Sequence, residues 1–84
     1  MSHQGPEIRY PCRWEYKVIG MAEDAVRIAI AEAVGDEEHT VTLSRMSAQG
    51  TYCSLRVAAL VKDEATRKGI GERLGNHPAV KIVL

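Results

Sequence analysis

The sequence predicts a small α+β domain, in which two helices cover one face of a four-stranded antiparallel sheet. Two kinds of pattern support this fold class. In four segments apolar and polar residues alternate, which is typical of half-buried strands. In two other segments apolar residues recur every three or four positions, which is the spacing of an amphipathic helix. The order of these segments along the 84 residues decides the topology.

The first strand and the first helix are predicted over residues 13–20 and 22–33. The apolar side of the strand consists of Trp14, Tyr16 and Val18. The helix has one continuous apolar stripe, made of Ala22, Ala25, Val26, Ala29, Ile30 and Ala33. Gly35 follows the stripe, at the position where glycine commonly ends a helix.

A hairpin is predicted next, with strands over residues 39–47 and 51–61 and a loop over residues 47–50. Val41 and Leu43 alternate with threonine and serine in its first strand, and β-branched residues favour strands. The apolar side of its second strand consists of Cys53, Leu55, Val57, Ala59 and Val61. Gly50 suits the turn between the two strands.

A second helix is predicted to begin after Asp63, whose carboxylate suits an N-cap, and to run to Leu74, where Gly75 stops it. Ile70 and Leu74 are its best apolar anchors. Residues 79–84 then alternate again, as a last strand. We expect Val80, Ile82 and Leu84 to point from this strand towards the helices.

The element order β-α-β-β-α-β is that of the ferredoxin-like sandwich. Its sheet has the strand order 4-1-3-2, with both helices on one face. An unrelated α+β sandwich with the same element order is the alternative. Residues 11–84 form the single predicted domain, and residues 1–10, which are polar and aperiodic, form a predicted mobile N-terminal tail.

Eleven basic residues balance eleven acidic ones, so the formal net charge is zero. A neutral chain has no general attraction to nucleic acid or to anionic membranes, and it has little repulsion against self-association. No apolar run approaches the roughly 18 residues of a membrane span. The N-terminal residues lack the features of a signal peptide. We therefore expect a cytoplasmic protein that does not bind membranes.

The sequence offers no constellation that indicates catalysis. Cys12 and Cys53 fall at opposite ends of neighbouring strands, too far apart for a disulfide or a shared metal. His39 and His77 are expected on the two opposite edge strands or their loops, so they would not meet. His77, between Asn76 and Pro78, is typical of a turn. We therefore expect no enzyme, no catalytic residue, no metal and no cofactor.

The uncovered face of the predicted sheet mixes apolar and basic side chains, as partner surfaces often do. This candidate interface consists of Lys17, Ile19, Met46, Arg56, Leu60, Lys81 and Val83. The alternative for the same face is a single-stranded RNA module, which stacks bases on exposed aromatic residues. Because Trp14 and Tyr16 should face the helices, Tyr52 is the aromatic residue left for that role.

Three stretches of the chain resemble the YbeD-like family of small bacterial proteins. They are Tyr10-Pro11-Cys12 with Lys17-Val18-Ile19-Gly20, then Ser47, Gly50, Tyr52 and Ser54, and finally His77-Pro78-Ala79-Val80 with Leu84. The resemblance covers residues 10–84. It implies a ferredoxin-like fold similar to the ACT regulatory domains, which bind small effectors after the first strand. The corresponding positions here are Gly20, Met21, Ala22 and Glu23.

The resemblance implies no catalytic residues, and a link to lipoate metabolism has been suggested for some members of the family. We therefore expect a non-enzymatic regulatory or adaptor domain, which acts by dimerisation, by docking a protein partner or by binding a small effector. The alternative function is single-stranded RNA binding on the open sheet face.

Overall fold

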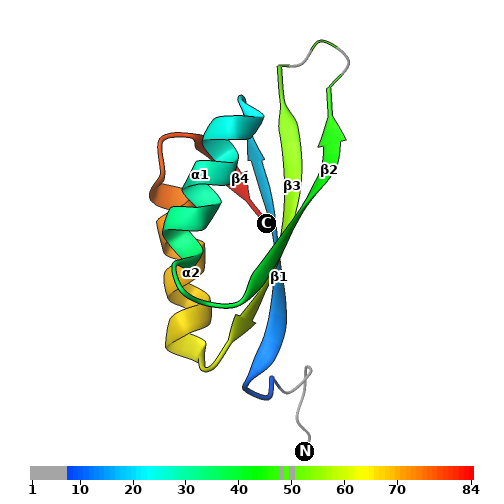
Figure 1. Cartoon of the computed structure of the whole chain (residues 1–84). Coiled ribbons are helices and arrows are strands. Elements are labelled where there is room, and N and C mark those ends of the chain that lie inside the picture. The colour runs from blue at the N-terminus through cyan, green and yellow to red at the C-terminus, as the bar shows by residue number, and fades with distance from the viewer. Residues whose placement is uncertain (1–7, 48, 50) are drawn as a thin grey trace, which may run out of the picture.

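A computed structural model describes residues 8–47, 49 and 51–84. The element order is β1 (Cys12–Gly20), α1 (Glu23–Val34), β2 (His39–Met46), β3 (Cys53–Val61), α2 (Glu64–Asn76) and β4 (Val80–Val83). The strands form one antiparallel sheet in the order β2-β3-β1-β4, and both helices lie on the same face of it (Figure 1). The predicted α+β sandwich and its strand order are thereby confirmed. Most of the predicted tail, residues 1–7, lies outside the described residues.

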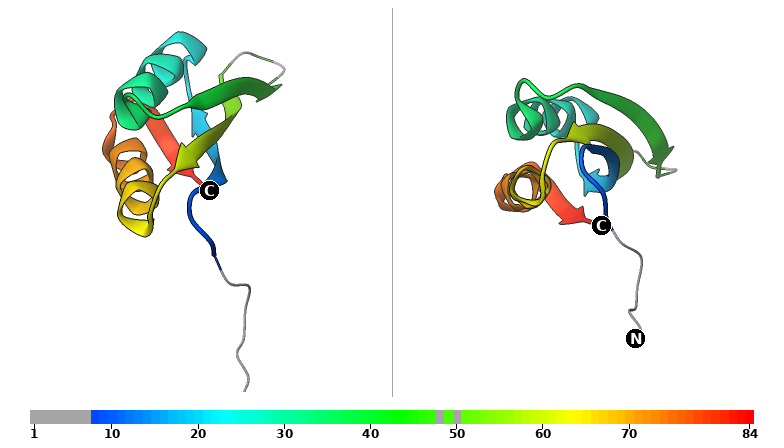
Figure 2. Two further views of the ribbon diagram at one scale, coloured as in Figure 1. Left: turned by 60° about the horizontal axis from the view of Figure 1, so that its bottom comes forward. Right: turned by 90° about the horizontal axis from the view of Figure 1, so that it is seen from below.

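The core fills the space between the helices and the central pair of strands, β1 and β3 (Figure 2). The register pairs the apolar residues of β1 with the apolar residues of β3 on the side that faces the helices. Almost all of these side chains are therefore buried. The largest fully buried side chains are Ile30, Leu55, Ile70, Leu74, Val18, Val26, Val57 and Val61.

The two helices differ in the residues that cap their ends. Ala22, the N-cap of α1, makes no side-chain cap, and Gly35 ends that helix with a φ of 66°, a backbone conformation that glycine adopts readily. In α2, the Asp63 carboxylate accepts a hydrogen bond of 2.7 Å from the Thr66 N–H, so the predicted cap is confirmed. The predicted end at Leu74, with Gly75 as the stop, is wrong. The helix continues to Asn76, and Pro78 ends it by forcing the preceding residue into extended backbone.

Strand β2 contains a bulge that changes the direction of its last residues. Leu43 pairs with Leu55, whereas Arg45 pairs with Ser54, so Ser44 is an extra residue. Arg45 therefore lies on the open face of the sheet and Met46, opposite the core residue Cys53, lies on the helix side. The predicted position of Met46 on the open face is wrong for this reason.

Strand β4 contains a second irregularity with the same effect. Ile82 pairs with Ile19 and Val80 pairs with Gly20, which leaves Lys81 as the extra residue. Val80 and Val83 consequently pack on the core, whereas Ile82 is 50% exposed. The predicted inward set of Val80, Ile82 and Leu84 is correct only for Val80. Val83, which was predicted on the open face, lies on the helix side instead.

Gly20 allows three elements to meet closely at the end of β1. A Cβ atom at this position would collide with the Ala79 carbonyl oxygen and with a methyl group of Val26. The backbone of β1 therefore lies directly against the entry to β4 and against α1. Only a residue without a side chain fits there.

The N-terminal end of β1 is attached to α2 through Arg67. The Arg67 guanidinium lies over the Trp14 ring, 4.4 Å from its centroid, and its Nε donates a hydrogen bond of 2.8 Å to the Tyr10 hydroxyl. The Tyr16 hydroxyl donates to the Arg67 carbonyl at 2.7 Å. Burial raises the pKa of Tyr16, so this hydroxyl stays protonated as the donor.

Substitution of Gly20 tests the close approach. Gly20→Ala should lower the free energy of unfolding by about 1–3 kcal/mol, since the Ala79 backbone cannot move aside easily. Gly75→Ala is the matched control, because nothing lies within 4 Å of a Cβ built there. That control should be neutral or raise stability by about 0.4–1 kcal/mol. Urea unfolding measures both, and equal effects would contradict the close approach.

Substitutions in β4 test which of its side chains face the core. Val80→Ala should cost about 1–3 kcal/mol of unfolding free energy, because Val80 is 8% exposed. Ile82→Ala should change it by no more than about 0.5–1 kcal/mol, because this side chain faces solvent. Thermal unfolding of the two variants provides the comparison. A larger loss for Ile82→Ala would show that the strand alternates without the bulge.

The N-cap of α2 makes a pH-dependent contribution to stability. Hydrogen bonds from Thr66 hold the pKa of Asp63 below its ordinary value. The carboxylate therefore stabilises the fold above the unfolded-state pKa of about 3.9, and this contribution is lost as the pH falls through the lower folded-state pKa. Asp63→Ala should lower the thermal midpoint at pH 7 and converge with the wild type in acid. Asp63→Asn keeps a cap that does not titrate, so its midpoint relative to Asp63→Ala should not depend on pH.

Candidate functional site

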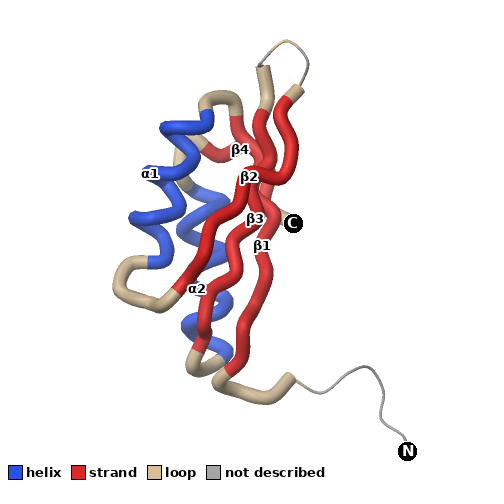
Figure 3. The backbone as a smooth tube through the Cα atoms, turned by 45° about the vertical axis from the view of Figure 1, so that its right-hand side comes forward, coloured by secondary structure: helices blue, strands red, loops and turns tan. Residues whose placement is uncertain are grey.

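One face of the sheet carries no helix (Figure 3). The register of β1 with β3 places four side chains of each strand on this open face, as neighbours in pairs. The pairs are Arg13 with Leu60, Glu15 with Ala58, Lys17 with Arg56, and Ile19 with Ser54. The predicted positions of Lys17, Ile19, Arg56 and Leu60 on the open face agree with this register.

Exposed apolar side chains from the edge of the sheet extend this surface. Ile82 pairs with Ile19, and Leu84 exchanges two backbone hydrogen bonds with Lys17, of 3.1 and 2.8 Å. Ile82 is 50% exposed and Leu84 is 71% exposed. Because of the irregularity in β4, Ile82 and Leu84 lie on the open face, and the predicted Val83 does not.

The basic side chains of the open face differ in how they are paired. Arg13 forms an ion pair of 2.8 Å with Glu38, and Arg56 lies 3.9 Å from the Glu15 carboxylate. Lys17 and Arg45 have no ion-pair partner among the described residues. The open face therefore carries two cations that the described part of the chain does not neutralise.

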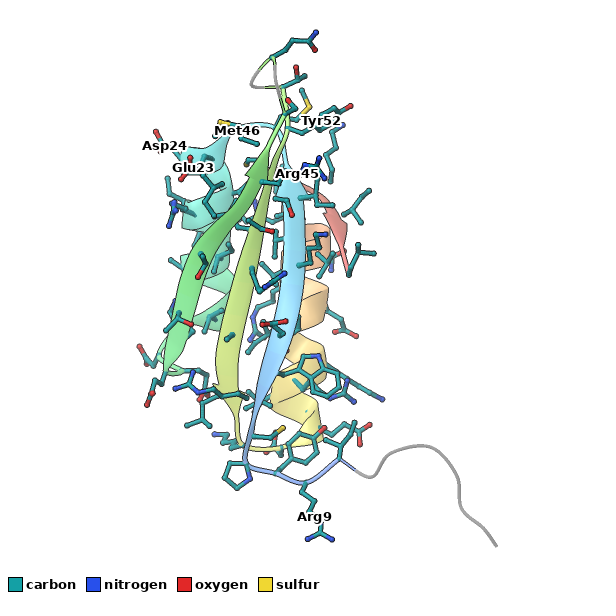
Figure 4. The ribbon with its side chains drawn as sticks, turned by 90° about the vertical axis from the view of Figure 1, so that its right-hand side faces the viewer. Arg9, Glu23, Asp24, Arg45, Met46 and Tyr52 are labelled. Carbon is teal, nitrogen blue, oxygen red and sulfur yellow. The ribbon has the colours of Figure 1, made fainter. Side chains whose placement is uncertain are left out.

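Two shallow hollows lie on the open face. The first, of about 210 Å³, lies beside the end of β4 and is lined by Glu15, Tyr16, Lys17, Arg56 and Leu84. The second, of about 130 Å³, lies beside the hairpin and is lined by Ile19, Arg45, Ser47, Tyr52, Cys53 and Ser54. We call the second one the hairpin hollow. Figure 4 views the open face and labels Arg45 and Tyr52 beside this hairpin.

The hairpin that borders this hollow is held by Ser47. Its hydroxyl accepts hydrogen bonds from the backbone N–H groups of Thr51, at 2.9 Å, and Tyr52, at 3.1 Å. Its own N–H donates to the Tyr52 carbonyl at 2.9 Å. The predicted loop over residues 47–50 lies in part outside the described residues, because residues 48 and 50 do.

The positions predicted for a small effector, Gly20 to Glu23, join the end of β1 to the start of α1, and effector binding there stays a prediction. Gly20 is buried against other elements, and Met21 is 48% exposed. The Glu23 carboxylate accepts a hydrogen bond of 2.8 Å from Arg27 within α1. Two hollows of the open face and a third between the helix ends are lined by other residues.

A third hollow, of about 320 Å³, lies between the helix ends and is lined by Glu32, Ala33, Arg73, Asn76, His77 and Pro78. Three of its polar side chains, Glu32, Arg73 and His77, are already engaged in hydrogen bonds. The His77 Nε2 lies 2.9 Å from the Glu32 carboxylate, and the His77 Nδ1 accepts from the Ala79 N–H at 3.1 Å. Arg73 Nε donates to the Ala33 carbonyl at 2.9 Å. These bonds fit the predicted turn at His77.

The thiols and metal-ligating groups are dispersed. Cys12 pairs with Val61 and Cys53 pairs with Gly20, at opposite ends of the β1–β3 ladder, and both cysteines are free. Burial raises the pKa of the Cys53 thiol, which suits a core residue rather than a nucleophile. The described residues contain no group of three histidine, cysteine or acidic side chains that could hold a metal ion.

Aromatic side chains lie mainly on the helix side. Tyr16 is buried, and Trp14 packs against the core beneath Arg67. Tyr52 is 52% exposed and lines the hairpin hollow. The base-stacking platform of RNA recognition needs aromatic residues on the central strands of the open face, and here those positions carry Glu15, Lys17 and Arg56 instead.

Sequence reasoning did not identify Ser54 and Arg45 as site residues. The Ser54 hydroxyl is buried and has no hydrogen-bond partner among the described residues. Arg45 reaches the open face only because of the bulge at Ser44. Alternation of polar and apolar residues contains no mark of a bulge, so the sequence pattern alone could not bring these two side chains together.

Comparison with known proteins identifies similar folds and no activity. A solution structure of HP0495 from Helicobacter pylori is similar, with a TM-score of 0.80, 22% identity and coverage of 100% of this chain and 98% of that chain. A second solution structure, of the hypothetical protein HP0495 from Helicobacter pylori, gives a TM-score of 0.66 at 23% identity over 99% and 96% of the two chains. These identities support a shared fold alone. No curated protein matches the chain.

No helix among the described residues is long and apolar enough to cross a membrane. A family model described as "Protein of unknown function (DUF493)" matches residues 5–84. Since that match covers nearly the whole chain, the protein belongs to the DUF493 family.

Proposed function

We propose that this protein is a non-enzymatic adaptor or regulatory domain, which docks an acidic surface of a protein partner on its open sheet face. The observation that carries the proposal is that exposed apolar side chains lie on one uncovered face together with positive charge that the described residues do not neutralise. Ile82 and Leu84 supply the apolar area, and Lys17 and Arg45 supply the charge.

The composition of this face resembles that of known partner surfaces. Protein interfaces combine an apolar centre with a polar rim, and they favour aromatic residues and arginine. Here Ile19 and Ile82 form neighbouring apolar positions, while Tyr52, Arg45 and Arg56 lie around them on the same face. The uncompensated charges favour an acidic partner, because complementary potentials speed association and exclude wrong partners.

The chemistry of the remaining side chains supports binding rather than catalysis. The thiol of Cys53 is buried, and both ring nitrogens of His77 are occupied by hydrogen bonds. The resemblance to YbeD-like proteins, which implies no catalytic residues, agrees with this proposal. A second copy of the chain as partner would use the same face, and measurement of the oligomeric state distinguishes that case.

A pair of matched variants tests the docking face. Ile82→Asp places a negative charge on the open face, and Ile28→Asp places it on α1, where Ile28 is 58% exposed. Both exposed positions should tolerate the change with a loss of about 1 kcal/mol or less. Affinity capture from the native host, with quantitative mass spectrometry, identifies partners of the wild type. Their affinity should fall at least about tenfold for Ile82→Asp and should be unchanged for Ile28→Asp.

Three outcomes would contradict the proposal. Partners retained by Ile82→Asp and lost by Ile28→Asp would place docking on the helix layer. Capture that disappears on ribonuclease treatment would favour the RNA-binding alternative. A partner affinity that does not fall with rising salt would remove the argument from charge, because screening weakens exposed electrostatic attraction.

A further inference from the structure

We propose that the hairpin hollow is a binding site for a small organic carboxylate with a compact apolar body. The hollow is lined by Ile19, Arg45, Tyr52 and Ser54. In this proposal the Arg45 guanidinium and the Ser54 hydroxyl bind the carboxylate, and Ile19 and Tyr52 contact the apolar body. The ligand site shares Ile19, Arg45 and Tyr52 with the proposed docking face. The two proposals are nevertheless tested apart, because Ile82→Asp tests docking and Ser54→Ala tests ligand binding.

The bulge in β2 places Arg45 at the site. Without the bulge, Ser44 would lie on the open face with Thr42, and Arg45 would lie on the helix side with Leu43. With it, Arg45 lies directly opposite Ser54 on the open face. Bulges often re-aim a side chain beside a functional site, and here the re-aimed side chain is an arginine without an ion-pair partner among the described residues.

The hydroxyl of Ser54 is the second observation that points to a ligand. Ser54 is 8% exposed, and its Oγ has no hydrogen-bond partner in the described part of the chain. Buried polar groups in native proteins almost always have a partner, so a ligand or a water molecule beside the described residues would satisfy this hydroxyl. A carboxylate oxygen that accepts from both Ser54 and Arg45 would satisfy the hydroxyl and the guanidinium together. An ordered water is the alternative partner.

The charge and the walls of the hollow define the class of ligand. One guanidinium and one hydroxyl match a singly charged carboxylate, and arginine binds carboxylates through two parallel N–H groups. Ile19 and the ring of Tyr52 offer apolar surface beside these polar groups. The volume of about 130 Å³ is well below the roughly 300–1,000 Å³ of sites that enclose drug-sized ligands, so the bound group is compact.

Nuclear magnetic resonance of the full chain, labelled with nitrogen-15, tests the site with sodium benzoate as the probe. Titration against sodium chloride at matched ionic strength should produce saturating shifts of the amide signals of Arg45, Ser54 and Ile19. A ligand of so few atoms should bind with a dissociation constant in the millimolar range. Benzamide has the same shape without the charge, and it should bind at least about tenfold more weakly.

Three variants separate this site from general attraction of anions. Arg45→Gln and Ser54→Ala should each weaken benzoate binding about tenfold, since each removes a hydrogen bond to a charged group. Ser54→Ala should also keep or raise the thermal midpoint, because it removes a buried hydroxyl without a partner. Arg56→Gln is the control on the same face, because Arg56 does not line the hairpin hollow, and it should leave binding unchanged.

The proposal would be overturned by any of three results. Equal shifts with benzoate and benzamide would show that the hollow does not recognise the carboxylate. Equal loss of binding in Arg56→Gln and Arg45→Gln would show diffuse attraction to the whole basic face. Absence of saturating shifts at Ser54 would mean that water alone fills the position beside its hydroxyl.

Discussion

The close approach at Gly20 is the constraint on which the arrangement of the layers depends. At this one residue the end of β1, the entry to β4 and helix α1 come into direct contact, through the Ala79 carbonyl and Val26. The sheet edge and the helix layer are therefore in direct contact at this residue. The extra residue Lys81 then decides where the side chains of the four-residue strand β4 point.

Both edge strands carry an extra residue, and this irregularity decides which side chains the open face presents. The face of a strand alternates with every residue, so one insertion reverses all positions that follow it. In β2 the insertion brings Arg45 out and turns Met46 towards the helix side. In β4 it brings Ile82 out and turns Val83 in. The central strands have no such irregularity, and they supply the regular part of the core.

The sequence pattern predicts the six elements, their order and the strand order, because these follow from apolar periodicity over long segments. It also predicts the Asp63 cap, which rests on local chemistry. It does not predict the bulges, since Leu43-Ser44-Arg45-Met46 and Val80-Lys81-Ile82-Val83 contain no residue that demands one. The positions on the open face were consequently predicted correctly on β1 and β3 and wrongly at Met46 and Val83. The unpartnered Ser54 hydroxyl depends on packing between strands, which no local pattern records.

The short length of β4 has a consequence for how this neutral chain avoids aggregation. Pairing with β1 extends from Gly20 to the Lys17–Leu84 hydrogen bonds, so on that side the backbone from Cys12 to Tyr16 has no strand partner among the described residues. Open edges of this kind recruit strands from other molecules. Charged side chains lie along this open stretch. They are Arg13 and Glu15 of β1, and Arg67, whose guanidinium is stacked on Trp14. These charged and bulky side chains thus oppose the pairing of this edge with a strand of another molecule. Repulsion between whole molecules cannot do so, because the net charge is zero.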